Sequence, residues 1–327
     1  MKLMTRLFAA LATVATAATA TMSFAQTKWD MPTGYGVGSF QTQNVQRFAD
    51  DVEKATAGKL KITLHPNGSL FKANEIRRAV QTGQSQAGEF IISGAANENA
   101  IFGVDSIPFL ATSYDEAKRL HAAAKPTTEK LLAGYGMKVL FASPWPGQNL
   151  YSRKAIAGPQ DLAGTKMRAY NPATSRIAQL LKAQPTTIQL ADLPQALTTG
   201  GVDNFLTSSA SGIENKLYEQ VKFFYSVNAW LPKNVIVVNQ KAFDALDKAT
   251  QDVVVKAASD AEARDWATSA QKDDEFTKEL VARGVKVSPP SDTLRKELQT
   301  IGATMTEEWL KSAGADGQAI INAFRKQ

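Results

Sequence analysis

The chain has 327 residues, with 37 Lys and Arg against 31 Asp and Glu for a net charge of +6, and it contains two His and no Cys. Hydrophobic residues make up 44% and charged residues 21%, which is ordinary for a globular protein and excludes a disordered or collagen-like chain. Without Cys there can be no disulfide, thiol nucleophile, thiolate-bound zinc or iron–sulfur cluster, and two His leave little for a His-based metal site.

The first 25 residues have the pattern of a secretory signal peptide. Lys2 and Arg6 form a positive n-region, an apolar and small-residue run covers 7–20, and Ser-Phe-Ala at 23–25 resembles an A-x-A cleavage site. The run is too short to span a bilayer, and no later segment is long and apolar enough. We therefore expect a cleaved signal and a periplasmic protein. Loss of the two leader cations lowers the net charge from +6 to +4, which is too mild for nucleic-acid binding through a basic stripe.

The first half of the chain is predicted to alternate between strands and helices, from the spacing of its apolar residues. The expected elements are a strand over 27–31, a glycine-rich loop over 32–38, a helix around 45–52 that ends at Gly58, a strand over 60–64, a turn at 66–68, a short helix over 76–80, a buried strand over 90–92, a helix over 114–132 and a strand over 137–141.

The alternation continues through the second half. We expect a strand over 166–170, a helix over 173–181, strands over 202–206 and 235–238, a helical stretch over 241–283 broken near 272–274, and a terminal helix after 289–290. Strands that alternate with helices indicate α/β layers with mostly parallel sheets. Two such groups flank roughly 143–158, so the pattern favours two lobes.

The sequence contains only incomplete matches to known enzyme motifs. The segment 34–39 departs from the dinucleotide fingerprint because Ser39 replaces its last Gly. The segment 83–87 resembles a nucleophile elbow, but its predicted helix and strand come in reversed order. His65 and His121 are interpreted as structural. We expect no catalytic residue, no metal and no cofactor, and an exported two-lobed α/β protein of this kind suits a ligand clamp.

One stretch resembles a known family. Residues 159–172 read Pro-Gln-Asp-Leu-Ala-Gly-Thr-Lys-Met-Arg-Ala-Tyr-Asn-Pro, similar to the P-x-D-L-x-G-x-K-x-R segment of DctP-type solute-binding proteins of TRAP transporters. Further matching segments lie, in the same order as in that family, at 48–62, 66–75, 107–110, 196–203 and 237–244. Each match is weak alone, but their order and spacing are specific and cover nearly the whole mature chain.

The resemblance implies a periplasmic clamp of two α/β lobes, each a mostly parallel sheet flanked by helices, with long C-terminal helices spanning the lobes. The expected divisions are a signal peptide at 1–25, a first lobe at 26–147 plus about 234–275, and a second lobe at 148–233 plus about 276–327. Such a receptor closes on an organic acid and delivers it to the small and large subunits of an ion-driven membrane permease. It performs no chemistry.

Arg168 is the principal candidate for ligand binding. It ends a predicted parallel strand, and open α/β sheets place their ligands at the carboxyl ends of strands. A guanidinium group can hold a carboxylate through two parallel hydrogen bonds. The resemblance implies that this Arg binds the substrate carboxylate.

Other candidates surround it. Asn171 could add an amide contact, and Thr207 or Ser208 could donate a hydroxyl where the family often has Asn. Glu75 matches a family acid near the ligand, although a helix-start acid is an equal interpretation. Four more candidates would cover the ligand or pack between the lobes: Tyr35, Phe71, Trp230 and Asn234.

One departure from the family pattern concerns the ligand. Many members have a second Arg after the strand that enters the second lobe, whereas this chain has Gln148 and Asn149 there. The substitution disfavours dicarboxylates, so we expect a small monocarboxylate such as a pantoate-like hydroxy acid, a pyroglutamate-like lactam or an aromatic oxo acid. The alternatives are a C4-dicarboxylate or aromatic-acid TRAP receptor, an ABC-type receptor and an exported hydrolase.

Overall fold

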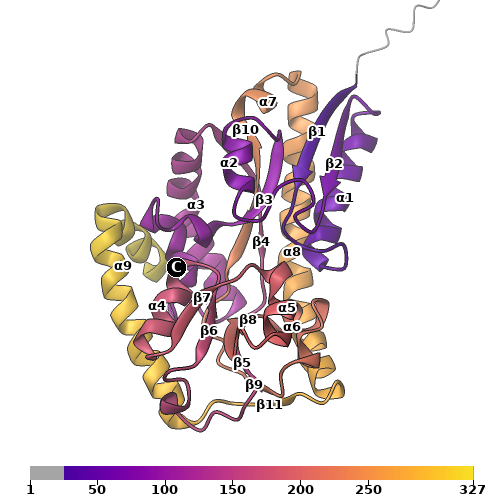
Figure 1. Ribbon diagram of the computed structural model, residues 1–327. Coiled ribbons are helices and arrows are strands. Elements are labelled where there is room, and N and C mark those ends of the chain that lie inside the picture. Colours follow the sequence, from indigo (N-terminus) through magenta and orange to yellow (C-terminus); the bar gives the residue numbers. More distant parts are fainter. Residues whose placement is uncertain (1–25, 327) are drawn as a thin grey trace, which may run out of the picture.

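The computed structural model describes residues 26–326, so the predicted signal peptide lies outside the described residues. Two sheets form the centre of the molecule, one in the upper and one in the lower half of Figure 1. The upper sheet contains β1 (Thr27–Pro32), β2 (Leu60–His65), β3 (Ala87–Ile91), β4 (Met137–Pro144) and β10 (Lys233–Asn239). β1 pairs with β2 in parallel, β10 lies between β3 and β4, and a parallel bridge from Thr33 to Glu89 links the two groups.

The lower sheet has the order β11-β9-β5-β8-β6-β7. Its strands are β5 (Asn149–Ser152), β6 (Lys166–Ala169), β7 (Gln184–Thr187), β8 (Asn204–Thr207), β9 (Phe223–Tyr225) and β11 (Lys286–Ser288). In this sheet only β5 is antiparallel to its neighbours, and in the upper sheet only β10 is. Each of these strands is the first one after the chain crosses from the other sheet. Both sheets are otherwise parallel, as the sequence predicts.

The two crossing segments, 145–148 and 226–232, lie side by side. The backbone N–H of Trp145 donates to Pro232 O at 2.9 Å, and that of Gln148 donates to Trp230 O at 2.9 Å. These hydrogen bonds tie both crossings into one connection between the sheets.

Helices cover the sheets and bridge them. They are α1 (Phe40–Ala55), α2 (Ile76–Gln81), α3 (Tyr114–Gly134), α4 (Pro172–Leu180), α5 (Leu193–Thr198), α6 (Ser209–Glu214), α7 (Gln240–Asp244), α8 (Lys248–Ala282) and α9 (Asp292–Lys326). α8 packs against α1 and β4 above and against α6 and β11 below, so it spans both sheets (Figure 1). α9 runs along the opposite side and changes direction at Gly314, where φ is 59°.

The expected break in the helix near 272–274 is wrong, because α8 is continuous there. Lys272 forms an ion pair with Glu275 along the helix, and Asp273 accepts a hydrogen bond from Ser209 of α6 at 2.7 Å. The charged run is thus a helix surface that docks on the lower half of the molecule. Among the described residues, no helix is long and apolar enough to cross a membrane.

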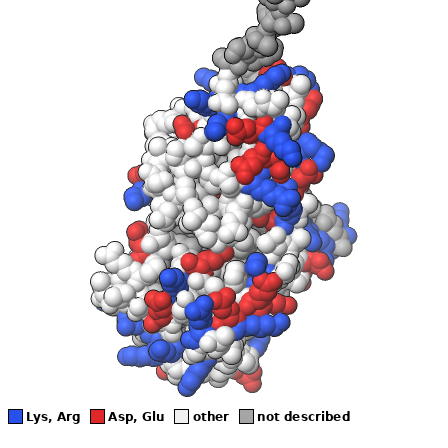
Figure 2. Space-filling view, turned by 90° about the vertical axis from the view of Figure 1, so that its right-hand side faces the viewer, with Lys and Arg blue, Asp and Glu red and all other residues white. Residues whose placement is uncertain are grey.

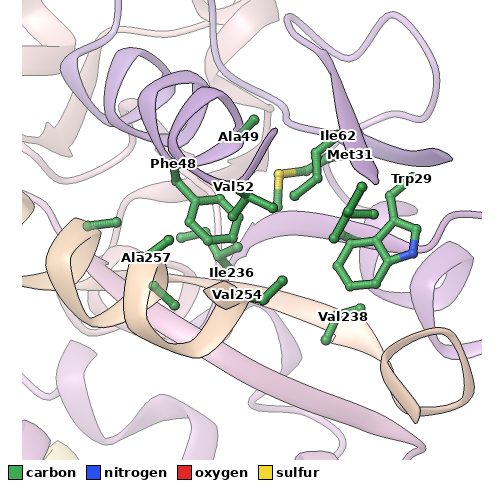
Figure 3. Close-up of a cluster of buried hydrophobic side chains, with 14 of the residues drawn as sticks. Trp29, Met31, Phe48, Ala49, Val52, Ile62, Ile236, Val238, Val254 and Ala257 are labelled. Atoms are coloured by element: carbon green, nitrogen blue, oxygen red, sulfur yellow. The ribbon is translucent and has the colours of Figure 1, made fainter. Parts of the chain in front are cut away.

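The largest core lies between the upper sheet and the helices α1 and α8 (Figure 3). Phe48 of α1 meets Phe141 of β4 edge to face, with ring centroids 5.3 Å apart. On the face of the molecule seen in Figure 2, cations and anions are intermingled, and a broad uncharged area adjoins them.

Candidate functional site

A cavity of about 860 Å³ lies between the two sheets, within the range of small-molecule sites. One wall comes from the loops after β1 and β2 and from the end of β3. The other wall comes from β6, the start of α4, the segment 187–192 and the end of β8. Trp145, Gln148 and Pro232 of the crossing segments complete it.

Arg168 of β6 lines this cavity and is 3% exposed. Its Nε donates to Ile188 O at 2.9 Å, and its guanidinium carbon lies 5.1 Å from the centroid of the Tyr170 ring. No carboxylate among residues 26–326 lies within ion-pair distance of it. Burial lowers the pKa of Arg168 to about 10, so the side chain keeps its charge at neutral pH. A buried cation without an acidic partner is costly, and an anionic ligand would compensate it.

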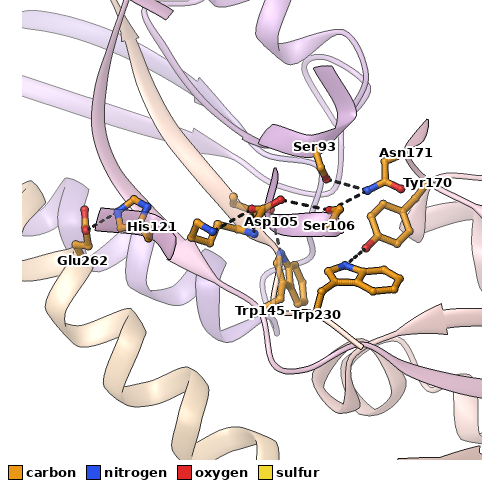
Figure 4. A network of polar contacts seen from close by, with 11 residues as sticks. Ser93, Asp105, Ser106, His121, Trp145, Tyr170, Asn171, Trp230 and Glu262 are labelled. Atoms are coloured by element: carbon orange, nitrogen blue, oxygen red, sulfur yellow. Dashed lines mark hydrogen bonds and ion pairs between the residues drawn. The ribbon is translucent and has the colours of Figure 1, made fainter. Parts of the chain in front are cut away.

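Tyr170 closes one side of the arginine site through a short network. Its hydroxyl donates to Gln148 Oε1 at 3.2 Å. It also accepts from Trp230 Nε1 at 3.3 Å (Figure 4). Gln148 Nε2 in turn donates to Pro146 O at 3.1 Å. Gln148 lines the cavity, whereas Trp230 lies behind Tyr170 and outside the lining.

Asn171 lines the cavity and also connects its two walls. Its Oδ1 caps α4 by accepting from Thr174 N at 2.8 Å. Its Nδ2 donates to Ser93 Oγ at 2.9 Å and to Ser106 Oγ at 3.2 Å, on the upper side (Figure 4). Both amide hydrogens are thus used within the protein.

Glu89 is the site residue that the sequence did not reveal. It lies in the middle of β3, is 0% exposed and lines the cavity. Its Oε2 accepts from Thr33 Oγ at 2.6 Å and its Oε1 from Asn234 Nδ2 at 2.8 Å. Burial raises the pKa of Glu89 despite these two donors. The only signal for it was a single acid within an otherwise apolar strand, Ala-Gly-Glu-Phe-Ile.

Asn234 arranges this end of the cavity without lining it. Besides donating to Glu89, it accepts at Oδ1 from Tyr35 Oη and from Trp145 Nε1, both at 3.0 Å. Tyr35 lines the cavity next to Trp145, with ring centroids 5.1 Å apart. Burial raises the pKa of Tyr35, so its hydroxyl stays neutral.

The remaining candidates differ in their positions. Thr207 lines the cavity at the end of β8, and Ser208 follows it as the N-cap of α6. Asn149 is buried outside the lining and accepts from the backbone N–H of Asn228 at 2.8 Å, which joins the crossing segments. Glu75 is an exposed helix-start residue that accepts from the Lys72 N–H at 3.0 Å.

Phe71 also lies outside the lining and packs against the core around α2. Five sequence candidates therefore line one cavity: Tyr35, Gln148, Arg168, Asn171 and Thr207. Direct ligand contact stays a prediction for each of them. In the part of the chain that the structure describes, no three His, Asp or Glu side chains are grouped so as to hold a metal.

The site can hold a small polar anion in a defined orientation. One wall offers a buried guanidinium, and the other offers a buried carboxyl whose two partners donate to it. Neutral amide and hydroxyl groups lie between them. This combination is complementary to a molecule that carries a carboxylate and a separate N–H group.

Comparison with known proteins supplies independent findings. A family model described as "bacterial extracellular solute-binding protein, family 7" (DctP) matches residues 34–312. The chain is 46% identical to DctP6 of Bordetella pertussis, an extracytoplasmic solute receptor binding pyroglutamic acid, with a TM-score of 0.90 and 92% of this chain and 100% of that one covered. It is 42% identical, with a TM-score of 0.91, to a TRAP solute-binding protein from an unidentified marine microbe that is specific for pyroglutamate, covering 92% and 99% of the two chains.

Among curated relatives, the 2,3-diketo-L-gulonate-binding periplasmic protein of Escherichia coli is 25% identical over 240 residues, which cover 70% of this chain and 71% of that protein.

Proposed function

The chain belongs to the DctP family of TRAP solute-binding proteins, and from that premise we propose that its ligand is a cyclic monocarboxylate with a ring N–H, of which pyroglutamate is the simplest. Family membership confirms the resemblance found in the sequence, and the fold is that of a TRAP periplasmic binding protein. The family and the similar structures are receptors that bind small organic acids. The proposal concerns which acid this chain binds.

The observation that supports it most is the buried guanidinium of Arg168 and the buried carboxyl of Glu89 on facing walls. Arg168 has no carboxylate partner among the described residues, and Glu89 accepts hydrogen bonds from two donors. A ligand carboxylate would bind Arg168, and a ring N–H would donate to Glu89. A lactam acid supplies both groups in one rigid molecule, which lowers the entropy cost of binding.

The residue at the expected place of a second Arg supports a single negative charge on the ligand. Gln148 lies there, and its side chain is held by Tyr170 and by Pro146 O. A second carboxylate would meet neutral amide groups at this wall, where its desolvation would not be compensated. Solute-binding proteins with 42% and 46% identity to this chain bind pyroglutamate, which agrees with this choice.

Calorimetry on residues 26–327 tests the proposal, after unfolding and refolding to remove any ligand trapped during expression. We expect L-pyroglutamate to bind tightly. The lactone analogue, with ring O in place of N–H, should bind at least about 100-fold more weakly, since Glu89 would lose a donor and face an acceptor. The pyroglutamyl amide and succinate should bind weakly or not at all. Equal affinity for lactam and lactone would overturn the role of Glu89, and absence of pyroglutamate binding would overturn the proposal.

The proposal extends to the cellular setting. Members of the family are periplasmic receptors, and we propose cleavage of the leader after residue 25 and delivery of the ligand to the small and large subunits of a TRAP permease. We also propose that the two sheets form the cores of two lobes with the boundaries given above, which close on the ligand. A population shift of this kind requires the ligand to bind the closed state more tightly.

A further inference from the structure

A second buried acid lies behind the ligand site. Asp265 of α8 is 0% exposed, and neither of its carboxylate oxygens has a hydrogen-bond partner. The side chains of Ser143 and Asn44 face it and lower its pKa, but neither lies in good hydrogen-bonding geometry. Ser143 is itself 0% exposed, and its hydroxyl is also without a partner. Buried polar groups in native proteins nearly always have partners, so this group calls for an explanation.

The strand register connects Asp265 to the ligand site. Ser143 of β4 pairs with Asn234 of β10, and Glu89 of β3 pairs with Ile236 of β10. Because side chains alternate along a strand, Ser143, Asn234 and Glu89 share one face of the upper sheet. α8 packs on that face, and the charge of Glu89 acts on Asp265. One buried polar cluster thus runs from α8 to the cavity wall.

The charged groups around the cluster do not neutralise Asp265. The cation next to it, Arg264, pairs with Asp51 of α1 at 3.2 Å and donates from Nε to Asn44 Oδ1 at 2.9 Å. Glu262, on the preceding turn of α8, is directed to His121 of α3 at 3.2 Å (Figure 4). The remaining charged neighbour is Glu89, which carries the same sign as Asp265.

We infer that Glu89 and Asp265 act as a coupled acid pair that holds one negative charge, with the charge on Glu89 and the proton on Asp265. Glu89 accepts from two donors, whereas Asp265 accepts from none, so the charge is more stable on Glu89. Like charges in one desolvated cluster repel each other, so the second carboxyl ionises only at higher pH. Asp265 is then a positioning residue that acts on the ligand through Glu89.

The pair couples ligand capture to proton uptake, a step that rests on the proposed function. The ligand brings its own carboxylate into this desolvated site, and the added negative charge makes ionisation of Asp265 harder. Burial, together with the charge of Glu89, raises the pKa of Asp265 to about 7, so its proton is exchanged near neutral pH. Above that pH, binding of the ligand returns a proton from solvent to Asp265, and the affinity declines as the pH rises.

Calorimetry with L-pyroglutamate tests this coupling between about pH 6 and about pH 8.5. Titrations in buffers of different ionisation enthalpy measure the number of protons that the protein takes up on binding. We expect the wild type to take up protons at the upper end of the range and to lose affinity, about tenfold for each pKa unit by which the ligand shifts Asp265. The Asp265→Asn protein should not take up this proton, and its affinity should not change with pH at the upper end of the range. Asp260→Asn, an exposed change on the same helix, should behave as the wild type. Proton uptake that is the same in Asp265→Asn as in the wild type would overturn the inference.

A ligand-free measurement separates this inference from the proposed ligand. Carboxyl carbon NMR can titrate Asp265 in the wild type and in Glu89→Gln, where the like charge is removed and Asp265 is intact. The pKa of Asp265 should fall in Glu89→Gln, and an unchanged value would refute the pair. If pyroglutamate fails to bind at every pH, the proposed function falls, while the titration still decides whether the acids are coupled.

Discussion

Glu214, the last residue of α6, accepts a hydrogen bond at 3.0 Å from the backbone N–H of Phe40, which begins α1 and is 174 residues distant in sequence. This contact joins a helix of the lower half of the molecule to one of the upper half. Around it, Ala210 packs with the rings of Phe40 and Trp145. A carboxylate at a helix N-terminus is favoured by the helix dipole, yet Glu214 Oε2 is buried without a partner.

Glu214→Gln should change how stability depends on pH. Burial raises the pKa of Glu214 from 4.5 to about 7 in the folded protein, so folding favours the protonated acid. That stability is fully present below about pH 4.5 and is lost as the pH rises through about 7. Gln stays neutral and can still accept from the Phe40 N–H. The variant should therefore match the wild type in urea unfolding near pH 5 and exceed it by about 1–3 kcal/mol near pH 8.

Glu279→Gln is the control for that experiment, because Glu279 lies on the surface of α8 and pairs with Arg283. It should show no comparable rise with pH. If the difference between Glu214→Gln and the wild type is the same at both pH values, the buried carboxyl does not titrate as described.

Arg168→Ala should leave the fold intact and weaken carboxylate binding by at least about 100-fold, since charge-assisted hydrogen bonds contribute about 1.5–3 kcal/mol each. Arg168→Lys should restore only part of the affinity, because an ammonium group lacks the planar fork. Arg176 also lines the cavity but is held by Glu308 at 2.6 Å. Arg176→Ala should therefore have a small effect in the same calorimetric titration, and equal losses at the two positions would refute the special role of Arg168.

Ser93→Ala removes a hydrogen bond between the two cavity walls and leaves the N-cap of α4 intact. Asn171 performs both tasks, through Nδ2 to Ser93 and through Oδ1 to the Thr174 N–H. Ser93→Ala should lower the free energy of unfolding by about 0.5–1.5 kcal/mol. Asn171→Ala should cost at least about 1 kcal/mol more, because the helix cap and the hydrogen bond to Ser106 are lost too. Urea denaturation of both variants measures the difference, and equal costs would show that neither the cap nor the bond to Ser106 contributes.

Asp105→Ala should lower the free energy of unfolding more than most other single substitutions in the upper half of the molecule. Asp105 and Lys233 form an ion pair at 3.1 Å with side chains only 3% and 7% exposed. Removal of one partner leaves a buried charge, at a cost of about 3–5 kcal/mol. Asp252→Ala breaks the exposed Lys248–Asp252 pair of α8 and should cost at most about 1 kcal/mol in the same unfolding assay. Similar losses for the two variants would contradict the difference in burial.

Long elements were predictable because their periodicity extends over many residues. The helix expected over 114–132 is α3 (Tyr114–Gly134), and the strand expected over 137–141 is β4 (Met137–Pro144). The short strands β5, β7, β9 and β11 were not predicted, because their residues do not alternate clearly between apolar and polar. They are strands because neighbouring strands supply their hydrogen bonds.

By itself, the sequence determined the alternation of strands and helices, the family, and Arg168, which lies within a contiguous motif at a strand end. Only the tertiary structure placed Glu89 in the wall of the cavity. Its partners Thr33 and Asn234 are 56 and 145 residues away along the chain, and folding alone brings them within hydrogen-bond distance. A local pattern can show that a strand is buried, but the charge state of an acid within that strand depends on donors and charges that the sheet register places beside it.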